Sequence, residues 1–338
     1  MRKRIPIEVE NKIEQVFSKL SGVKNTVPYD LKTTFTFKGR KSVQIAETIM
    51  SVMTDTDDLI YDPFMGGGSF ILSAVQAGRK IFATELDNYI FNAVKVLFEH
   101  CDISNLQKYY DMIESEVKQD IMDLYATTCC GEKNYINKLF YDPEEEEYFN
   151  PTPHREIIDG ENIKLVFECP ICGKKSKTFT KEDLEKIKQL EEVDTSRFPQ
   201  VEYIENSRIN ITASTGANQY DRIFTQRNKI ALLKLQEAID TIPHGKERDF
   251  LQHVLVASLS LARIAMYGSS TDILYHVVPH SAQEMNVWLI FQKKYDNFVR
   301  FKNQNPHILV DDIEDNAKYH IYNCDYKAFL DNNPDLLF

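Results

Sequence analysis

The stretch YDPFMGGGSF, residues 61–70, constrains the fold of this chain more than any other part of it. The chain has only 12 glycines in 338 residues, and three of them, Gly66, Gly67 and Gly68, stand together here. An apolar run precedes them, and the helix-like segment SFILSAVQAG follows. A strand that ends in a glycine turn and opens a helix brings backbone N–H groups to one point, where an anion is stabilised. The pattern predicts an anion-binding loop in an α/β fold.

The flanking segments extend this pattern in both directions. Residues 41–54 have the apolar spacing of a helix, and residues 58–64 (DLIYDPF) are expected to form a short buried strand. KIFATELD, residues 80–87, is predicted as a second strand, and NYIFNAVKVLFEH, residues 88–100, as a second helix. Alternation of strand and helix predicts a parallel sheet.

Two carboxylates narrow the choice of ligand. Glu85 comes at the end of the second strand, where it can bind both ribose hydroxyls of a nucleotide. Asp325, in NCDY, follows a third predicted strand and can meet the edge of an adenine ring. The loop is neither a dinucleotide fingerprint nor a phosphate loop, because it lacks G-x-G-x-x-G and Gly-Lys-Ser/Thr. These residues favour a nucleoside that carries a small charged group.

The remainder of the chain is predicted to contain an insert and a helical segment. Helices are expected at residues 227–240, 248–266 and 286–303, with Trp288 in the core. Residues 319–330 are expected to form a strand and a helix, and residues 335–338 a last strand. We predict four segments: an N-terminal arm with the cofactor-binding α/β half (1–124), a cysteine-containing insert (125–220), a helical segment (221–305) and a return to the sheet (306–338).

The glycine stretch resembles a known family motif. DPFMGGGSF is similar to the S-adenosylmethionine loop, Asp-Pro-Phe-x-Gly-x-Gly-Ser/Thr, of the DNA methyltransferases that methylate N6 of adenine or N4 of cytosine. FKGRKSVQIAETIM, residues 37–50, resembles the segment that packs beside the methionine end of the cofactor in that family. ATELD matches its ribose-binding position on Glu85, and YNCDYKAFL matches its adenine-contacting position on Asp325.

The resemblance spans roughly residues 35–338 and implies a fold and a cofactor. The implied fold is an incomplete class I S-adenosylmethionine-dependent methyltransferase (Rossmann-like) sheet, with a zinc-ribbon-like insert and a helical segment. The residues that it implies for cofactor binding are Arg40, Asp62, Pro63, Phe64, Gly66, Gly67, Gly68, Glu85, Leu86, Asp325 and Tyr326. It implies no catalytic residue in this chain.

Within the family, the chain most resembles adenine-specific methylases that contain a zinc ribbon. YATTCCGE, CPICGK and IFTQRN stand where those enzymes have their cysteine pairs and a helix start. The resemblance implies a structural zinc on Cys129, Cys130, Cys169 and Cys172. Cys129 and Cys130 are adjacent, however, so one of them with His154 or a water, a metal-free ribbon, and redox use remain alternatives. Arg227 and Asn228, in IFTQRN, are expected to cap a helix and to contact either DNA or the insert.

One family motif has no counterpart in this chain. The methyltransferases position the target amino group with Asp/Asn/Ser-Pro-Pro-Tyr/Phe, directly after the fourth strand. The 338 residues contain no Pro-Pro dipeptide, and the predicted strand at residues 335–338 ends the sequence where the motif is expected. We therefore expect a second methyltransferase subunit to complete the sheet and supply the motif, unless the sequence is a fragment.

Charge and hydropathy bound the remaining expectations. The net charge of −11 disfavours a self-sufficient nucleic-acid binder, although residues 1–41 hold ten Lys/Arg against four acids and Lys174, Lys175, Lys177 and Lys181 follow the second cysteine pair. The acidic run at residues 142–147 is expected to be a solvated loop. Neither a signal core nor an apolar run of membrane-spanning length is present, so cytoplasm is the expected location.

The expected substrate is double-stranded DNA, methylated on adenine N6 by a complex of this chain with its partner. N4-cytosine transfer stays open because the deciding motif is absent from the chain. A non-catalytic regulatory or DNA-binding scaffold with a methylase-like fold is the alternative of another class. An RNA or protein methyltransferase is a weaker alternative, since it shares the glycine loop but not the Asp-Pro-Phe form.

Overall fold

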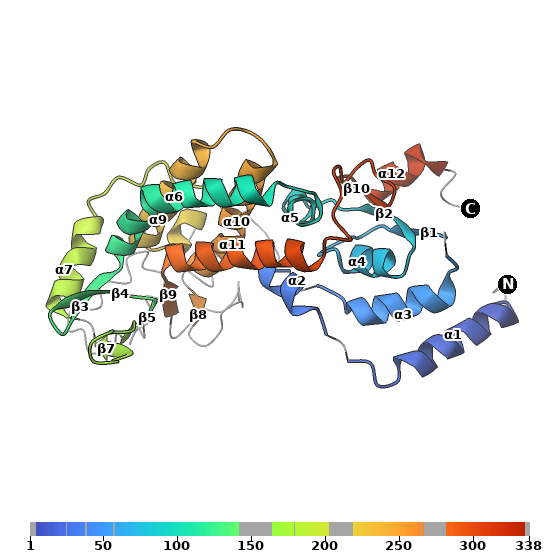
Figure 1. The fold of residues 1–338 in the computed structure, drawn as a ribbon, viewed down its shortest axis with the longest axis horizontal. Coiled ribbons are helices and arrows are strands. Elements are labelled where there is room, and N and C mark those ends of the chain that lie inside the picture. The colour runs from blue at the N-terminus through green and yellow to red at the C-terminus, as the bar shows by residue number, and fades with distance from the viewer. Residues whose placement is uncertain are drawn as a thin grey trace. The chain divides into compact units, whose positions relative to one another are not determined.

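A computed structural model describes residues 5–24, 26–37, 39–56, 58–141, 164–178, 180–202, 219–263, 265–266 and 282–334 (Figure 1). The acidic run at residues 142–147, His154 and the strand predicted at residues 335–338 lie outside these ranges. The chain divides into two compact units, of which unit 1 comprises residues 1–102 and 296–338 and unit 2 comprises residues 103–295. The four predicted segments follow other boundaries and stay a prediction.

Unit 1 is an α/β structure that contains the glycine stretch. Its elements in chain order are α1 (Ile7–Leu20), α2 (Tyr29–Thr34), α3 (Val43–Met53), β1 (Leu59–Asp62), α4 (Ser69–Gln76), β2 (Lys80–Thr84), α5 (Asn88–Phe98), β10 (Tyr319–Tyr322) and α12 (Tyr326–Asn332). The predicted elements from residue 41 to residue 100 are confirmed, as are the strand and the helix of residues 319–330. Helices α1 and α2 were not predicted.

The sheet of unit 1 has three parallel strands in the order β1-β2-β10. Figure 1 draws α4 and α12 on opposite sides of these strands. On the α4 side, Ile81, Ala83 and Ile321 are at most 1% exposed. Each such aliphatic side chain stabilises the fold by about 1.5–3 kcal/mol on full burial. This face is therefore the core of unit 1.

The first strand is less buried than its sequence predicts. β1 was expected to be a buried strand, yet Leu59 is 46% exposed and the other three residues are half-buried. The physical reason is the position of β1 at an edge of the described sheet, where β2 is its only described neighbour. Predicting the strand was correct, and predicting its complete burial was wrong.

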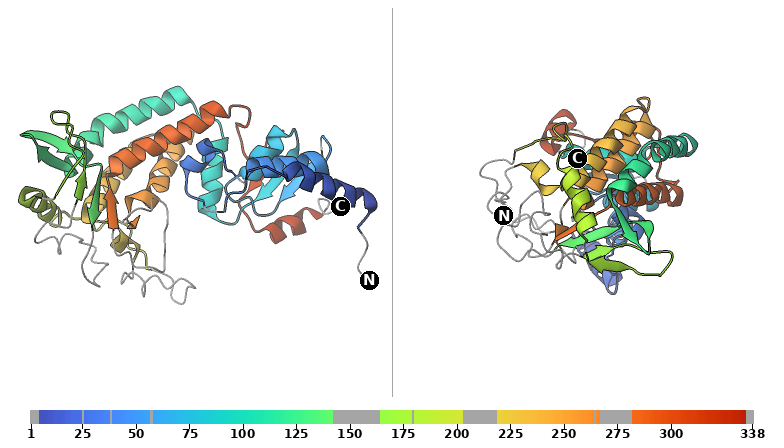
Figure 2. Two further views of the ribbon diagram at one scale, coloured as in Figure 1. Left: turned by 90° about the horizontal axis from the view of Figure 1, so that it is seen from below. Right: turned by 90° about the vertical axis from the view of Figure 1, so that its left-hand side faces the viewer.

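Unit 2 combines a group of helices with a mostly separate set of short strands (Figure 2). Its helices are α6 (Ile103–Leu124), α7 (Lys181–Leu190), the 3-10 turn η1 (Tyr220–Ile223), α9 (Gln226–Asp240), α10 (Lys246–Ala262) and residues 287–295 of α11 (Val287–Gln304). Trp288 is fully buried, as predicted. Tyr110 of α6 stacks on Tyr295 of α11, with ring centroids 4.0 Å apart.

The strands of unit 2 form two antiparallel sheets. β3 (Ala126–Cys129) and β4 (Glu132–Tyr135) make a hairpin. The second sheet has the order β7-β6-β5-β9-β8, from β5 (Lys138–Tyr141), β6 (Lys164–Val166), β7 (Ser176–Thr178), β8 (Ala265–Met266) and β9 (Ala282–Met285). No described helix is long and apolar enough to cross a membrane.

Two sequence expectations about unit 2 need correction. The helix predicted for residues 248–266 ends at Ala262, and residues 265–266 form β8 instead. The 22-residue helix α6 was not predicted at all. The signal that could have found α6 is the helical spacing of its buried side chains, which are Leu106, Tyr110, Ile113, Val117 and Ile121.

Candidate functional site

The three glycines turn the chain tightly between β1 and α4. The N–H of Met65 donates to the carbonyl of Thr84 on β2, which anchors the start of the turn at 3.0 Å. Gly66 has φ +54°, and a Cβ at this position would lie 2.8 Å from the ring of Phe37. A side chain at Gly66 would therefore meet both backbone strain and a fixed ring. Gly68 is the N-cap of α4 and leaves the first N–H groups of that helix facing the loop.

Arg40 lies against the middle of the glycine loop. A Cβ added to Gly67 would come within 2.7 Å of the Arg40 Cγ and Nε atoms. The guanidinium stacks on Phe35 at 4.2 Å, and its Nη1 donates to the Phe35 carbonyl at 2.9 Å. The Nε and Nη2 atoms are buried with no hydrogen-bond partner among the described residues. Burial lowers the pKa of Arg40 to about 10, so the group is still a cation at neutral pH.

Asp62 ends β1 on the other side of the same loop. Its Oδ1 accepts from the Phe64 N–H at 3.0 Å, while its Oδ2 is buried without a described partner. Burial raises the pKa of Asp62, and the bond from Phe64 partly opposes that shift. The Ser69 hydroxyl, in the first turn of α4, is likewise buried without a described partner. Ser69 was not among the predicted site residues.

Glu85 connects the glycine loop to the second helix. Its Oε2 accepts from the Gly66 N–H and its Oε1 from the Asp87 N–H, both at 2.9 Å. The sequence gave no sign that this carboxylate would hold the loop. Each carboxylate oxygen can accept a second hydrogen bond, so these contacts leave acceptor capacity for a ligand.

Asp325 stands beside Glu85 at the carboxyl end of the sheet. The Glu85 N–H donates to the Tyr322 carbonyl at 3.0 Å, and the Asn323 side chain donates to the Glu85 carbonyl at 2.8 Å. Asp325 is the N-cap of α12, where its Oδ1 accepts from the N–H groups of residues 327 and 328. These bonds leave its Oδ2 for other donors.

Apolar side chains border the same strand ends. Phe64 is 70% exposed and Leu86 is 69% exposed. The Phe64 and Tyr326 rings lie 5.1 Å apart. Large exposed apolar side chains next to unpaired polar atoms are typical of a ligand site. The structure thus brings all the predicted cofactor-binding residues to one end of the unit 1 sheet.

The four cysteines of the insert also come together. One ligand atom from each of Cys129, Cys130, Cys169 and Cys172 lies within 4.8 Å of all the others. The Cys129 Sγ is 3.8 Å from the Cys172 Sγ and 3.9 Å from the Cys130 Sγ. Four thiolates at about 2.3 Å from a tetrahedral zinc would be about 3.8 Å apart. The thiol positions therefore fit a tetrahedral metal.

The local backbone explains how two adjacent cysteines can face one point. Cys129 ends β3, and Cys130 and Gly131 form the two-residue turn of the hairpin with φ +55° and +78°. Such turns normally take Asn-Gly, so Cys130 is strained. In CPICGK, the backbone N–H groups of Cys172 and Ile171 face the Cys169 sulfur and lower the pKa of that thiol to about 7. Thiolate formation is what metal binding requires.

Arg227 and Asn228 do not belong to a surface site. They are 2% and 0% exposed, in the first turn of α9, and Thr225 rather than either of them caps this helix. Arg227 makes two 2.8 Å hydrogen bonds to the Glu284 carboxylate. Asn228 accepts from the Tyr125 hydroxyl at 2.7 Å. Of the two expected roles, contact with DNA is therefore wrong, and both residues pack inside unit 2.

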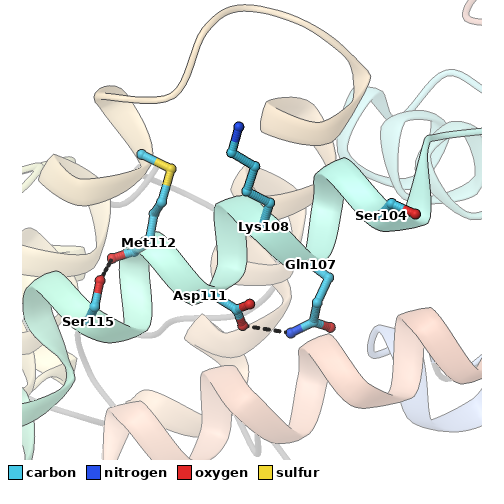
Figure 3. A pocket seen from close by; sticks show the side chains of 6 residues that line it. All are labelled: Ser104, Gln107, Lys108, Asp111, Met112 and Ser115. Carbon is cyan, nitrogen blue, oxygen red and sulfur yellow. Dashed lines mark hydrogen bonds between the residues drawn. The ribbon is translucent and has the colours of Figure 1, made fainter.

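Unit 2 also has a shallow recess of about 460 Å³ along α6 (Figure 3). It is lined by Ser104, Gln107, Lys108, Asp111, Met112 and Ser115, all from this one helix. The Gln107 amide donates to the Asp111 carboxylate at 2.8 Å, so two of its polar groups satisfy each other. The recess contains no residue of the glycine loop or of the cysteine cluster.

Comparison with known proteins supports the first of the two sites. Residues 4–96 match the N6/N4 methyltransferase family model, described as DNA methylase. The match supports a DNA methyltransferase family, and it runs from the N-terminal segment through the glycine loop and Glu85 into α5. It covers less than a third of the chain and includes neither the cysteines nor Asp325. No curated protein and no solved structure was found to match the chain significantly.

Proposed function

We propose that this chain is the S-adenosylmethionine-binding subunit of a DNA methyltransferase that methylates adenine N6. The observation that carries the proposal is a set of buried polar atoms without described partners around the glycine loop: Arg40 Nε and Nη2, Asp62 Oδ2 and Ser69 Oγ. Buried polar groups are almost always paired, so such a cluster indicates a missing ligand. The DNA methylase match over residues 4–96 supports the same conclusion.

The unpaired atoms fit the amino-acid end of S-adenosylmethionine. Arg40 would bind the carboxylate, since a guanidinium donates well to that group. Asp62 Oδ2 would accept from the ammonium group. A ligand with one anionic and one cationic substituent satisfies both, whereas a polyphosphate would leave Asp62 facing negative charge.

The rest of the cofactor would lie along the strand ends. Glu85 would accept from the ribose hydroxyls through its remaining lone pairs, and Asp325 Oδ2 would accept from the adenine amino group. Phe64, Leu86 and Tyr326 would flank the base, and Pro63 with the three glycines would shape the loop. The bound cofactor supplies a methyl group on a sulfonium, which is reactive toward an amino lone pair.

The residues that position the DNA base are proposed to come from a second polypeptide. This rests on the sequence, whose 338 residues hold no Pro-Pro dipeptide and so no Pro-Pro-Tyr/Phe motif. Adenine N6 is the favoured target because the cysteine-containing segments resemble those of adenine-specific enzymes. Cytosine N4 is the alternative, since the matched family model covers both.

We also propose a structural zinc on Cys129, Cys130, Cys169 and Cys172. The Sγ spacing supports this assignment. Four thiolates fill a tetrahedral site and leave no position for a substrate, so the metal would stabilise the insert rather than react. Metal analysis of the purified chain tests it: wild type should carry about one zinc per chain, as in closed four-thiolate sites. Cys169→Ser should lose it, and Cys101→Ser should keep it.

The direct test of the function is transfer of tritiated methyl from S-adenosylmethionine to plasmid DNA. The chain would be assayed alone and with the product of the neighbouring reading frame, against DNA, RNA and protein. Label in DNA only with both polypeptides is the expected result, and hydrolysis to N6-methyladenine identifies the target. Cofactor binding without any transfer would contradict the enzyme and leave a methylase-like scaffold.

A further inference from the structure

One face of the unit 1 sheet carries a row of aromatic side chains that are only half-buried. The strand register places Tyr61, Phe82 and His320 side by side across β1, β2 and β10. Residues on the opposite face, such as Ile81 and Ile321, are at most 1% exposed. The two faces of the same three strands are thus covered to very different extents.

Helix α12 covers only the carboxyl end of this aromatic face. Phe329 of α12 stacks on Tyr61 at 5.5 Å and on Tyr322 at 5.1 Å, and it is itself 8% exposed. Toward the amino end, Phe82 and His320 stack on each other at 4.8 Å and stay half-buried. Leu59, on the same face by alternation, is 46% exposed. Leu59, Phe82 and His320 are called the aromatic sheet patch below.

Parallel sheets are normally covered on both faces, and an exposed apolar patch of this kind marks an interaction site. The aromatic sheet patch is also continuous with the cofactor site. The Tyr61 hydroxyl is 3.1 Å from Thr84 Oγ1, which in turn donates to the Pro63 carbonyl at 3.1 Å. A molecule that covered the patch would therefore reach the strand ends that carry the glycine loop.

The surroundings of the patch are acidic. His320 Nδ1 lies 3.0 Å from the carbonyl oxygen of Glu314, whose side chain is exposed, as is that of Asp315. Residues 311–334 contain six Asp or Glu and two Lys. This charge repels DNA phosphates and attracts Lys and Arg, so the patch fits a protein with a basic border rather than nucleic acid.

We infer that the aromatic sheet patch binds an amphipathic helix of the second polypeptide, with Lys or Arg on either side of its apolar stripe. The inference rests on the proposed function, because the partner is the polypeptide that supplies the target-positioning motif. The helix would cover Leu59, Phe82 and His320 as α12 covers Tyr61. Its basic residues would pair with Glu314 and Asp315.

The test is the association of this chain with the product of the neighbouring reading frame, followed by sedimentation equilibrium. Leu59→Glu and Phe82→Glu place a charge in the patch, and Leu59 is exposed enough for its variant to fold. Ile7→Glu, on α1 where Ile7 is 75% exposed, is the matched control. We expect both patch variants to bind at least tenfold more weakly, and Ile7→Glu to bind as wild type does. Calorimetric binding of S-adenosylmethionine should be unchanged in all three.

Charge is tested with Glu314→Lys combined with Asp315→Lys, which should weaken association most at low salt. Association that survives both patch variants overturns the inference and leaves the proposed function standing. A homodimer of this chain that Phe82→Glu dissociates also overturns it, because the occupant is then a second copy. So does the lack of any complex with wild type. Loss of S-adenosylmethionine binding by wild type itself would instead count against the proposed function.

Discussion

At the scale of single residues, Arg40 gives the sharpest test of the cofactor assignment. Arg40→Ala should weaken S-adenosylmethionine binding about 10- to 150-fold, because hydrogen bonds to a charged group contribute about 1.5–3 kcal/mol. 5′-Methylthioadenosine has no amino-acid end, so its affinity should not change. Isothermal titration calorimetry of both ligands measures the difference. Equal losses for the two ligands would mean that Arg40 supports the loop rather than the carboxylate.

Asp62 predicts a dependence of stability on pH. Burial raises its pKa in the folded chain above the ordinary value of the unfolded chain. As pH rises, the unfolded state ionises first, so the folded state loses stability until its own pKa is passed. Asp62→Asn removes this penalty. In thermal melts, the variant should therefore gain on wild type from acid to neutral pH, and a constant difference would refute the explanation.

Some site residues could be predicted from the sequence, and others could not. Gly66 and Asp62 belong to a continuous stretch with a recognisable order, and strand ends of a parallel sheet bring Glu85 and Asp325 near them. The hydrogen bond from Gly66 to Glu85 depends on the exact height of two strands, which no local pattern specifies. The unpaired hydroxyl of Ser69 is a property of the packing and became visible only in the structure.

At the scale of secondary structure, the buried ion pair of α9 and β9 makes a stability prediction. Arg227 and Glu284 are 2% and 4% exposed and pair through two hydrogen bonds. Glu284→Ala should destabilise the fold by about 3–5 kcal/mol, because it leaves a buried charge unpaired. The exposed pair of Arg197 and Glu237 is the control, where Glu237→Ala should cost at most about 1 kcal/mol. Urea unfolding measures both, and similar losses would contradict the argument.

The elements themselves were predictable in unequal measure. Helices such as α3 and α5 follow from periodic apolar residues that are close in sequence. The five-stranded sheet of unit 2 does not, because β6 and β7 have three residues each and β8 only two. Strands this short show no alternation. The pairing of β5 with β9 also joins segments about 140 residues apart, which local patterns cannot reveal.

At the scale of the whole molecule, the division into two units means that the two proposed ligands should stabilise different parts of the chain. All the residues assigned to S-adenosylmethionine belong to unit 1, and all four cysteines belong to unit 2. Unit 1 is assembled from two separate stretches of sequence, with unit 2 between them. A chain of this kind need not unfold in one step.

Differential scanning calorimetry of the full chain should therefore show two transitions that respond separately. S-adenosylmethionine at 100 times its dissociation constant should stabilise the unit 1 transition by about 2.7 kcal/mol, since it binds only the folded state. Chelation of zinc, or Cys169→Ser, should lower the other transition alone. Cys101→Ser should leave the chelator-sensitive transition in place. A single transition that both the cofactor and the chelator move would show that the two units unfold together, because each ligand would then stabilise the entire chain.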